Sequence, residues 1–221
     1  SMVFGLDSWF HNFTQFTARA ITPEALADVP APYKEIAIYG ALKGAEVASV
    51  IGGLIVHPLY RIYLNRQLRP ETMTPNSYKI VRNTCRKLQG RILLSSFVIG
   101  PSLALLYSTT LSPSELANRC YAIRRNDHEL TIDRCTVACG FIGWYWKRFQ
   151  GAVDGINIGI TYALFNNKVL EPYTSPMLTN KIRSADQYPN VEEAAAQKSL
   201  LEAFLAGKER DQGRPESTVA V

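Results

Sequence analysis

The chain has few histidines and cysteines: three histidines and four cysteines among 221 residues. His11, His57 and His128 lie far apart, and no two cysteines have the CxxC spacing. A zinc site needs clustered histidine and cysteine ligands, and a disulfide framework needs regularly spaced cysteines. We therefore expect neither a metal site nor a fold built on disulfides.

The chain also lacks the short motifs that mark common catalytic and nucleotide-binding sites. It contains no GxSxG, no P-loop, no GxGxxG and no HExxH. We expect no catalytic and no cofactor-binding residue, and so no enzyme. The first 22 residues include Asp7 and a single arginine, Arg19, which fits neither a secretory signal nor a mitochondrial transit peptide.

Charge is missing from residues 92–111 and modest over the whole chain, whose net value is +5. An uncharged apolar run of this length can cross a bilayer as a helix. No block of like charges occurs, and the basic residues gather beside apolar segments. A nucleic-acid-binding face needs a basic cluster with interleaved aromatics, so we expect no nucleic-acid partner.

Apolar segments recur through the middle of the chain, and two of them contain a proline that predicts a kink, Pro58 and Pro101. The third segment is short, whereas the fourth would rise about 30 Å as a helix and so matches a hydrocarbon core. The predicted spans are 36–64, 92–111, 132–145 and 151–170.

The connections between these segments differ in charge. Residues 65–91 and the corner at 147–148 are basic, whereas the tail from 171 onward is slightly acidic. Four spans place both basic connections on one side of the membrane and both termini on the other. Because basic connections stay on the inner side, we expect both termini outside.

Glycine recurs at every fourth position of the last segment, at Gly151, Gly155 and Gly159. The first segment carries the same spacing at Gly40 and Gly44. Each glycine disfavours a soluble helix by about 1 kcal/mol relative to alanine, whereas small-residue stripes let membrane helices approach closely. We interpret these residues as helix-packing seams; the alternative is glycine in the loops and strands of a soluble α/β protein.

Among the acidic residues inside the apolar segments we single out Glu46 and Asp154 as intramembrane charges. Lys43 lies three residues before Glu46 and predicts an ion pair facing other helices, because a carboxylate buried in hydrocarbon must be paired or protonated. Ionisable residues in membrane segments are also functional candidates.

The cysteines suggest packing more than redox chemistry. Cys135 and Cys139 are four residues apart and share a helix face, so we interpret them as small packing residues. Cys120 and Cys135 fall on the same outer side of the predicted topology. We hypothesise a disulfide between these two, because an oxidising compartment would permit it.

Residues 7–20 place aromatic side chains at helical spacing, in an amphipathic N-terminal arm. Such a stripe suits a membrane interface, a partner groove or the chain's own core, and the pattern leaves this open. The aromatic residues are Trp9, Phe13 and Phe16, and the prolines that predict an extended linker after them are Pro23, Pro30 and Pro32.

The polar tail predicts one surface helix, Val191–Ala206. Asn190 and Glu193 have the spacing of a capping box, and Gly207 is a plausible stop. Its apolar side chains, which we expect to dock on a partner, are Leu201, Phe204 and Leu205.

The glycine pattern and the end of the fourth segment resemble the mitochondrial inner-membrane Tim translocase superfamily, over residues 36–170. The resemblance rests on the GxxxG of the first segment, the basic corner and the YALFNN sequence. The residues that carry it are Gly40, Gly44, Gly140, Gly143, Gly151, Gly159 and residues 162–167.

This resemblance implies an all-α, four-helix transmembrane bundle with glycine-rich packing in the mitochondrial inner membrane, its termini in the intermembrane space. It divides the chain into an arm (1–35), a membrane domain (36–170) and a polar extension (171–221). The family includes translocase subunits and a non-catalytic accessory subunit of respiratory complex I, the NADH:ubiquinone oxidoreductase. The charged second connection, Asp154 and the two arms depart from the translocase pattern. They favour an accessory subunit that supports assembly, stability and supercomplex contacts, with other membrane subunits and lipids such as cardiolipin as partners.

Overall fold

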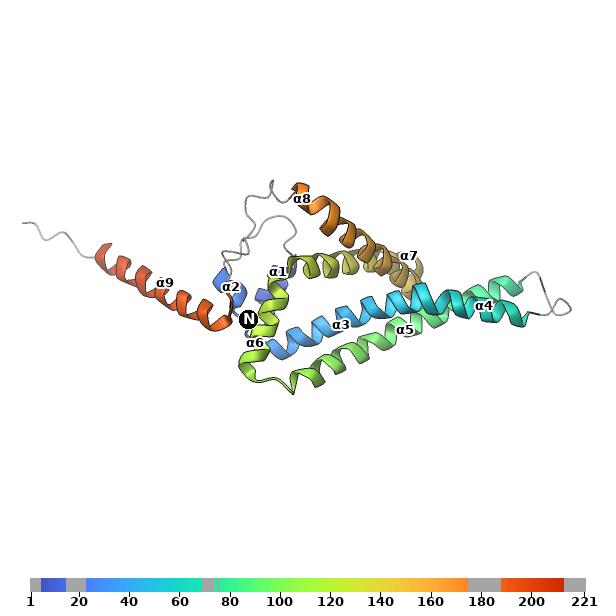
Figure 1. The fold of residues 1–221 in the computed structure, drawn as a ribbon, viewed down its shortest axis with the longest axis horizontal. Coiled ribbons are helices and arrows are strands. Elements are labelled where there is room, and N and C mark those ends of the chain that lie inside the picture. The colour runs from blue at the N-terminus through green and yellow to red at the C-terminus, as the bar shows by residue number, and fades with distance from the viewer. Residues whose placement is uncertain (1–4, 15–22, 69–73, 75, 175–187, 213–221) are drawn as a thin grey trace, which may run out of the picture.

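Helices make up every regular element of the described chain. The computed structural model describes residues 5–14, 23–68, 74, 76–174 and 188–212, and this part contains no strand. A long antiparallel helix pair lies beside a second, shorter pair, and short helices cover one end (Figure 1). The all-α prediction is confirmed.

The first long helix is continuous through three labelled parts, α3 (Pro32–Val50), the π-helical turn η1 (Ile51–Val56) and α4 (His57–Gln67). Pro32 begins it, at a position where no N–H is needed. A π-helical turn lies just before Pro58, the residue at which the sequence predicts a kink. A π-helical turn shifts the hydrogen-bond register and so accommodates the proline, which cannot donate.

The second long helix, α5 (Ser77–Ser108), runs antiparallel to the first and keeps Pro101 inside it. The basic connection predicted over 65–91 is therefore helical from Ser77 onward and continuous with the second apolar span. Val81, Cys85 and Gln89 are four residues apart and buried. Through this buried stripe α5 packs against the first long helix, and the exposed face of this part of α5 is basic.

A capping box starts α6 (Pro113–Arg125). This helix lies in the connection between the predicted second and third spans. Ser112 N–H donates to Glu115 Oε2 at 2.8 Å, and Glu115 N–H donates to Ser112 Oγ at 3.3 Å. These two bonds satisfy N–H groups that a helix start leaves open.

The second helix pair is formed by α7 (Asp127–Phe165), which reverses at Lys147 and Arg148. We call residues 127–146 its first limb and 149–165 its second limb. Arg148 has a φ of 55° and a ψ of −144°, a conformation that favours glycine. The reversal lies at the predicted basic corner, and η3 (Asn166–Leu170) and α8 (Glu171–Thr174) follow it.

The terminal segments lie at the opposite end from α4 (Figure 1). They contain α1 (Asp7–Thr14), α2 (Pro23–Ala27) and α9 (Val191–Gln212). The predicted linker therefore includes a helix, and α9 continues past Gly207, where the sequence suggested a stop. Phe16 lies outside the described residues.

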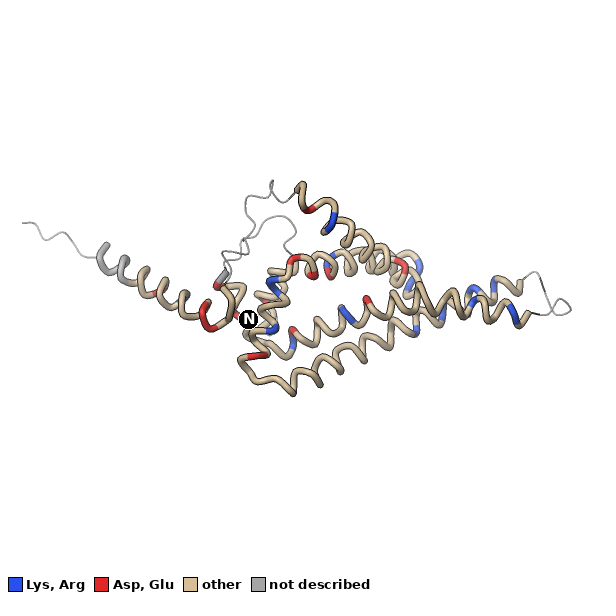
Figure 2. Tube along the Cα trace, in the orientation of Figure 1, with Lys and Arg blue, Asp and Glu red and all other residues tan. Residues whose placement is uncertain are grey.

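Two helices are long and apolar enough to cross a membrane, Pro32–Gln67 and Ser77–Ser108. Only 11% and 17% of their most apolar stretches are buried inside the chain, whereas the core helix of a soluble protein is mostly buried. Lysine and arginine lie on α4, on the start of α5 and at the α7 corner (Figure 2).

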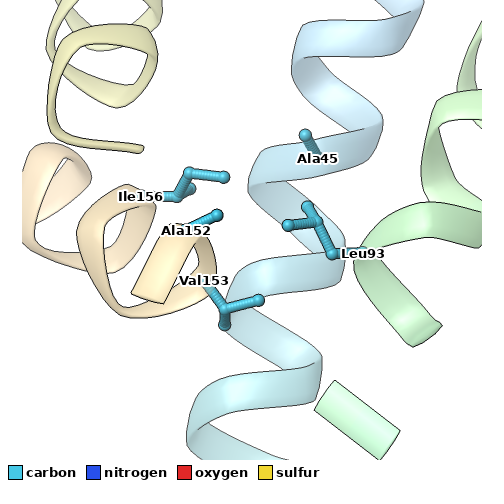
Figure 3. Close-up of a cluster of buried hydrophobic side chains, with 5 residues drawn as sticks. All are labelled: Ala45, Leu93, Ala152, Val153 and Ile156. Atoms are coloured by element: carbon cyan, nitrogen blue, oxygen red, sulfur yellow. The ribbon is translucent and has the colours of Figure 1, made fainter. Parts of the chain in front are cut away.

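The largest cluster of buried apolar side chains lies where α3, α5 and the second limb of α7 meet (Figure 3). Its members are Ala45, Leu93, Ala152, Val153 and Ile156. The cluster joins the two helix pairs into one body.

Candidate functional site

Close backbone approach joins α3 to α5 at three glycines. A Cβ added to Gly40 would lie 2.6 Å from the carbonyl O of Gly100, and one added to Gly44 would lie 3.0 Å from that of Ser96. Real Cβ atoms essentially never come within 3.0 Å of another heavy atom. Gly100, which the GxxxG pattern does not include, is the partner of both.

A second glycine seam joins the two limbs of α7. A Cβ on Gly159 would lie 2.6 Å from the carbonyl O of Cys135, and one on Gly155 would overlap that of Cys139. Gly143 and Gly151 face each other across the seam, each directly against the other's carbonyl. The glycines at every fourth position thus lie where the two backbones touch. We call these contacts, made by four glycines and two cysteines, the α7 seam.

Gly140 lies beside the α7 seam, where a Cβ would lie 2.9 Å from Ile156 Cγ1. At the open end of the hairpin, Asn167 Nδ2 donates to the carbonyl of His128 at 3.1 Å. The last residue of YALFNN therefore ties the end of the second limb to the start of the first.

A charge cluster lies between α3 and the first limb of α7. Lys43 Nζ lies 2.6 Å from Asp133 Oδ1 and 3.1 Å from Glu46 Oε2. Thr136 Oγ1 donates to Glu46 Oε1 at 3.2 Å. The predicted Lys43–Glu46 pair is confirmed. Glu46 and Asp133 are buried, so the single ammonium of Lys43 serves two carboxylates, and we call these four residues the Lys43 cluster.

Asp133 was missed by the sequence reasoning because it is 90 residues from Lys43. A signal existed, since Asp133 is an acidic residue inside a predicted span, as Glu46 is. Tyr39 OH adds a parallel contact one turn earlier, donating to Glu129 Oε2 at 3.0 Å.

A cavity of about 330 Å³ opens beside the Lys43 cluster. Its lining is apolar and aromatic apart from Glu46 and Thr136, and comes from α3, α5 and both limbs of α7. The apolar lining includes Leu93, Phe97, Phe141, Trp144 and Phe149. Glu46 is thus the one acidic group that lines this cavity.

Asp154 takes no part in either seam or in the cluster. Its side chain is exposed, although its neighbours Val153 and Gly155 are buried. Asp154 therefore lies in the predicted fourth segment but outside the glycine contacts, because the helix turns its carboxylate to the outer face.

The hypothesised disulfide between Cys120 and Cys135 is also wrong, since all four cysteines are free thiols. Cys120 is buried on α6 and donates to the carbonyl of Pro32 at 3.4 Å. Cys135 lies on the α7 seam against Gly159. Burial, reinforced by the charge of Glu35, raises the pKa of the Cys120 thiol to about 12.

Two buried arginines, which the sequence reasoning did not single out, fix the N-terminal arm to the helices. Arg124 pairs with Glu35 and donates to the carbonyls of Leu26 and Asp28. Arg134 donates to the carbonyls of Asn12 and Phe13, at the end of α1. The arm therefore packs on its own chain, and the described aromatic residues of its stripe, Trp9 and Phe13, are half-buried there.

The start of α9 is held in a similar way. Tyr121 OH donates to the carbonyl of Tyr188 at 3.0 Å, and Tyr188 OH donates to Glu24 Oε1 at 2.9 Å. Val191 N–H donates to Asn118 Oδ1 at 3.0 Å. Burial raises the pKa of Tyr121, and the bond to Glu24 raises that of Tyr188.

A family model described as a protein of unknown function, DUF1757, matches residues 9–166. The chain belongs to this family. The DUF1757 match begins inside α1 and ends at Asn166, so it includes both glycine seams, the Lys43 cluster and the docked arm. The arm is thus part of the family's matched region, and α9 is not. No curated protein matches the chain.

Proposed function

We propose that this DUF1757 protein is a non-catalytic structural subunit of a large mitochondrial inner-membrane complex, namely an accessory subunit of the membrane arm of complex I. In this proposal α3, α5 and the two limbs of α7 cross the membrane as a four-helix bundle. The arms at one end dock neighbouring subunits and support assembly.

The observation that carries the proposal is how the four segments are built. Each pair is joined through close glycine contacts, which is how membrane helices associate where lipid removes the hydrophobic driving force. Apart from Asp154, their outer faces are largely apolar: Phe97, Ile99, Phe141, Ile142 and Ile158 are all exposed. An apolar exterior of this extent would be a liability in water and is normal in a bilayer.

The ends of the segments support the same placement. Trp146 and Tyr145 are exposed beside Lys147 and Arg148 at the α7 corner, and interfacial aromatics with flanking cations are typical of a membrane boundary. The second limb would be about 25 Å long, somewhat short of a typical hydrocarbon core of about 30 Å.

The choice of mitochondrion and of complex I rests on the resemblance carried by YALFNN and the glycine pattern. The docked arms favour an accessory subunit, because the buried contacts of Arg124 and Arg134 hold α1, α2 and α6 in one arrangement. A fixed surface of this kind suits permanent neighbours.

A translocase subunit is the second candidate, and one observation favours it. Glu46 lines a cavity between the helix pairs and is itself paired within the Lys43 cluster. A polar group on such a cavity would suit the passage of a polypeptide. Asp154, on the outer face, would not contribute to it.

Native gel electrophoresis of digitonin-solubilised mitochondria, with mass spectrometry of the bands, tests the proposal. We expect comigration with NADH:ubiquinone oxidoreductase and resistance to carbonate extraction. Comigration with translocase subunits and absence from complex I would favour the second candidate. Release by carbonate would contradict both.

A further inference from the structure

The α4 end of the long helix pair projects beyond all other helices (Figure 1). The α7 corner marks where the four-segment layer stops, because a Cβ on Gly90 would lie 3.2 Å from Phe149 Cβ and one on Gly53 would lie 3.2 Å from Val153. Beyond this level α4 and the start of α5 continue for about 20 Å at 1.5 Å per residue. We call residues 54–67 and 76–91 the projecting hairpin.

Every charge on the projecting hairpin is positive (Figure 2). In the described chain between Glu46 and Glu115 there is no acidic residue, and no ion pair among the described residues includes a cation of this hairpin. The cations are Arg61, Arg66, Lys79, Arg82, Arg86, Lys87 and Arg91.

An apolar stripe runs along the side of α4 that faces away from α5. Ile55, Leu59 and Ile62 follow at intervals of four and three residues and so share one helix face. Their side chains are 51%, 62% and 51% exposed, whereas Tyr60 and Leu64, on the face toward α5, are half-buried. We call these three residues the α4 stripe.

Arginine continues the stripe. Arg66 follows Ile62 by four residues and lies on the same face, whereas Arg61 lies on the flank of α4, about 100° around the helix from Ile62. Both arginines are exposed. The projecting hairpin thus presents a row of aliphatic side chains that begins at the edge of the apolar layer, two residues after Gly53, and leads to the guanidinium group of Arg66 about 20 Å beyond it.

We infer that the α4 stripe is a docking site for an acidic amphipathic helix of a partner protein. Apolar residues of that helix, spaced by three and four, cover Ile55, Leu59 and Ile62, as in other helix-packing sites. Its carboxylates pair with Arg61 and Arg66. The inference rests on the membrane placement of the proposed function, but not on which complex the chain joins.

The chemistry of the surface favours a protein over other polyanions. Nucleic acid would neutralise the cations through its phosphates but would leave the aliphatic stripe in water. Lipid headgroups would reach Arg91 and Lys87, near the layer, but a hairpin that projects about 20 Å carries Arg66 away from them. Only a surface with both apolar and acidic groups covers stripe and arginines together.

Site-specific photocross-linking in intact membranes tests the inference. A benzophenone side chain replaces Leu59 in the full chain, and the matched control carries it at Thr84, an exposed α5 position outside the stripe. We expect one protein adduct at Leu59, stronger than at Thr84 by about fivefold or more, and weakened similarly by Arg61→Glu with Arg66→Glu. The corresponding lysine variants should keep the adduct within about twofold, because the charge remains.

The cross-linked peptide decides the chemistry of the partner. The sequence of this peptide must have the spacing of an amphipathic helix, with carboxylates beside its apolar face. An adduct of lipid mass, an adduct removed by ribonuclease, equal labelling at both positions or no adduct would each overturn the inference. If the glutamate variant fails to accumulate, the salt dependence of cross-linking is measured on the chain without the arginine substitutions. The yield of the Leu59 adduct must fall as salt rises to about 0.5 M.

Failure of this inference is distinct from failure of the proposed function. A chain that resists carbonate and comigrates with complex I but gives no Leu59 adduct keeps the function and loses the docking site. A chain released by carbonate loses the membrane placement on which both stand.

Discussion

Arg124 of α6 donates two hydrogen bonds to Glu35 of α3, from Nε to Oε2 at 2.9 Å and from Nη2 to Oε1 at 2.5 Å. The arginine is only 2% exposed. Its remaining N–H groups donate to the carbonyls of Leu26 and Asp28 and to Ser8 Oγ. One side chain therefore connects the start of the first long helix, the N-terminal arm and α6.

Replacing Arg124 should release the arm and destabilise the fold. Arg124→Met leaves the Glu35 carboxylate buried without its partner, a change that costs on the order of 3–5 kcal/mol. Thermal unfolding in detergent should show the loss, and hydrogen exchange should show faster exchange across α1. Arg119→Met, at an exposed position of the same helix, is the control, and equal effects of the two variants would contradict the role of Arg124.

The α7 seam should not tolerate side chains. Gly155→Ala places a Cβ against the carbonyl of Cys139, where only backbone movement gives room, at a cost of about 1–3 kcal/mol. Gly155→Leu should prevent accumulation in the native complex. Gly52→Ala is the matched control, because its Cβ would lie 3.3 Å from the side chain of Ile92, which can move. Quantitative mass spectrometry of the native band measures both, and normal accumulation of Gly155→Leu would refute the packing role.

The sequence predicts the α7 hairpin well because its signals are local. Gly151, Gly155 and Gly159 share a face by spacing alone, and the basic corner at Lys147 separates two apolar runs. The helical start of α5 was missed for a physical reason. Hydropathy reports burial in lipid, whereas residues 77–91 form a helix through a narrow stripe around Cys85 that packs on α4, with its basic face exposed.

The Lys43 cluster should behave as one unit. Lys43→Met leaves Glu46 and Asp133 close together without a cation, and we expect a loss on the order of 2–3 kcal/mol, because Lys43 is itself partly exposed. Adding Asp133→Asn should restore part of that stability, since one of the two uncompensated charges is removed. Unfolding of Lys43→Met, of Asp133→Asn and of the double variant, each compared with the unchanged chain, forms a double-mutant cycle. Strictly additive effects would mean that the contact carries no coupling.

Contacts between distant segments explain what the sequence left out of the candidate site. Lys43 and Glu46 are a helical turn apart, so their pair follows from spacing. Asp133 and Arg124 acquire their partners only when α6 and α7 lie against α3 and the arm, and no local pattern fixes that arrangement. The exposed position of Asp154 depends in the same way on how the second limb is rotated in the bundle.

Cys120 should resist alkylation. The thiolate is the reactive form, and a pKa raised to about 12 by burial leaves little of it at neutral pH. Intact-mass measurement after brief maleimide treatment should find Cys120 unmodified in the folded chain and labelled after denaturation. Cys120→Ser identifies the site, and labelling of Cys120 in the folded chain would contradict its burial.

The capping box of α6 should make stability depend on acid. Hydrogen bonds from the backbone N–H and hydroxyl of Ser112 lower the pKa of Glu115 below its ordinary value of 4.5. A group whose pKa is lowered by folding stabilises the fold above the unfolded-state pKa, and the effect is lost as pH falls through the lower, folded-state pKa. The contribution is therefore full at neutral pH and fades below about pH 4.5. In Glu115→Gln the side-chain amide oxygen still accepts a hydrogen bond from the backbone, but the group does not titrate. The difference in melting temperature between the unchanged chain and Glu115→Gln should therefore shrink as the pH is lowered. A difference that stays constant from about pH 7 to about pH 3, on either side of the ordinary pKa of 4.5, would mean that the charged form of Glu115 is not what the cap stabilises.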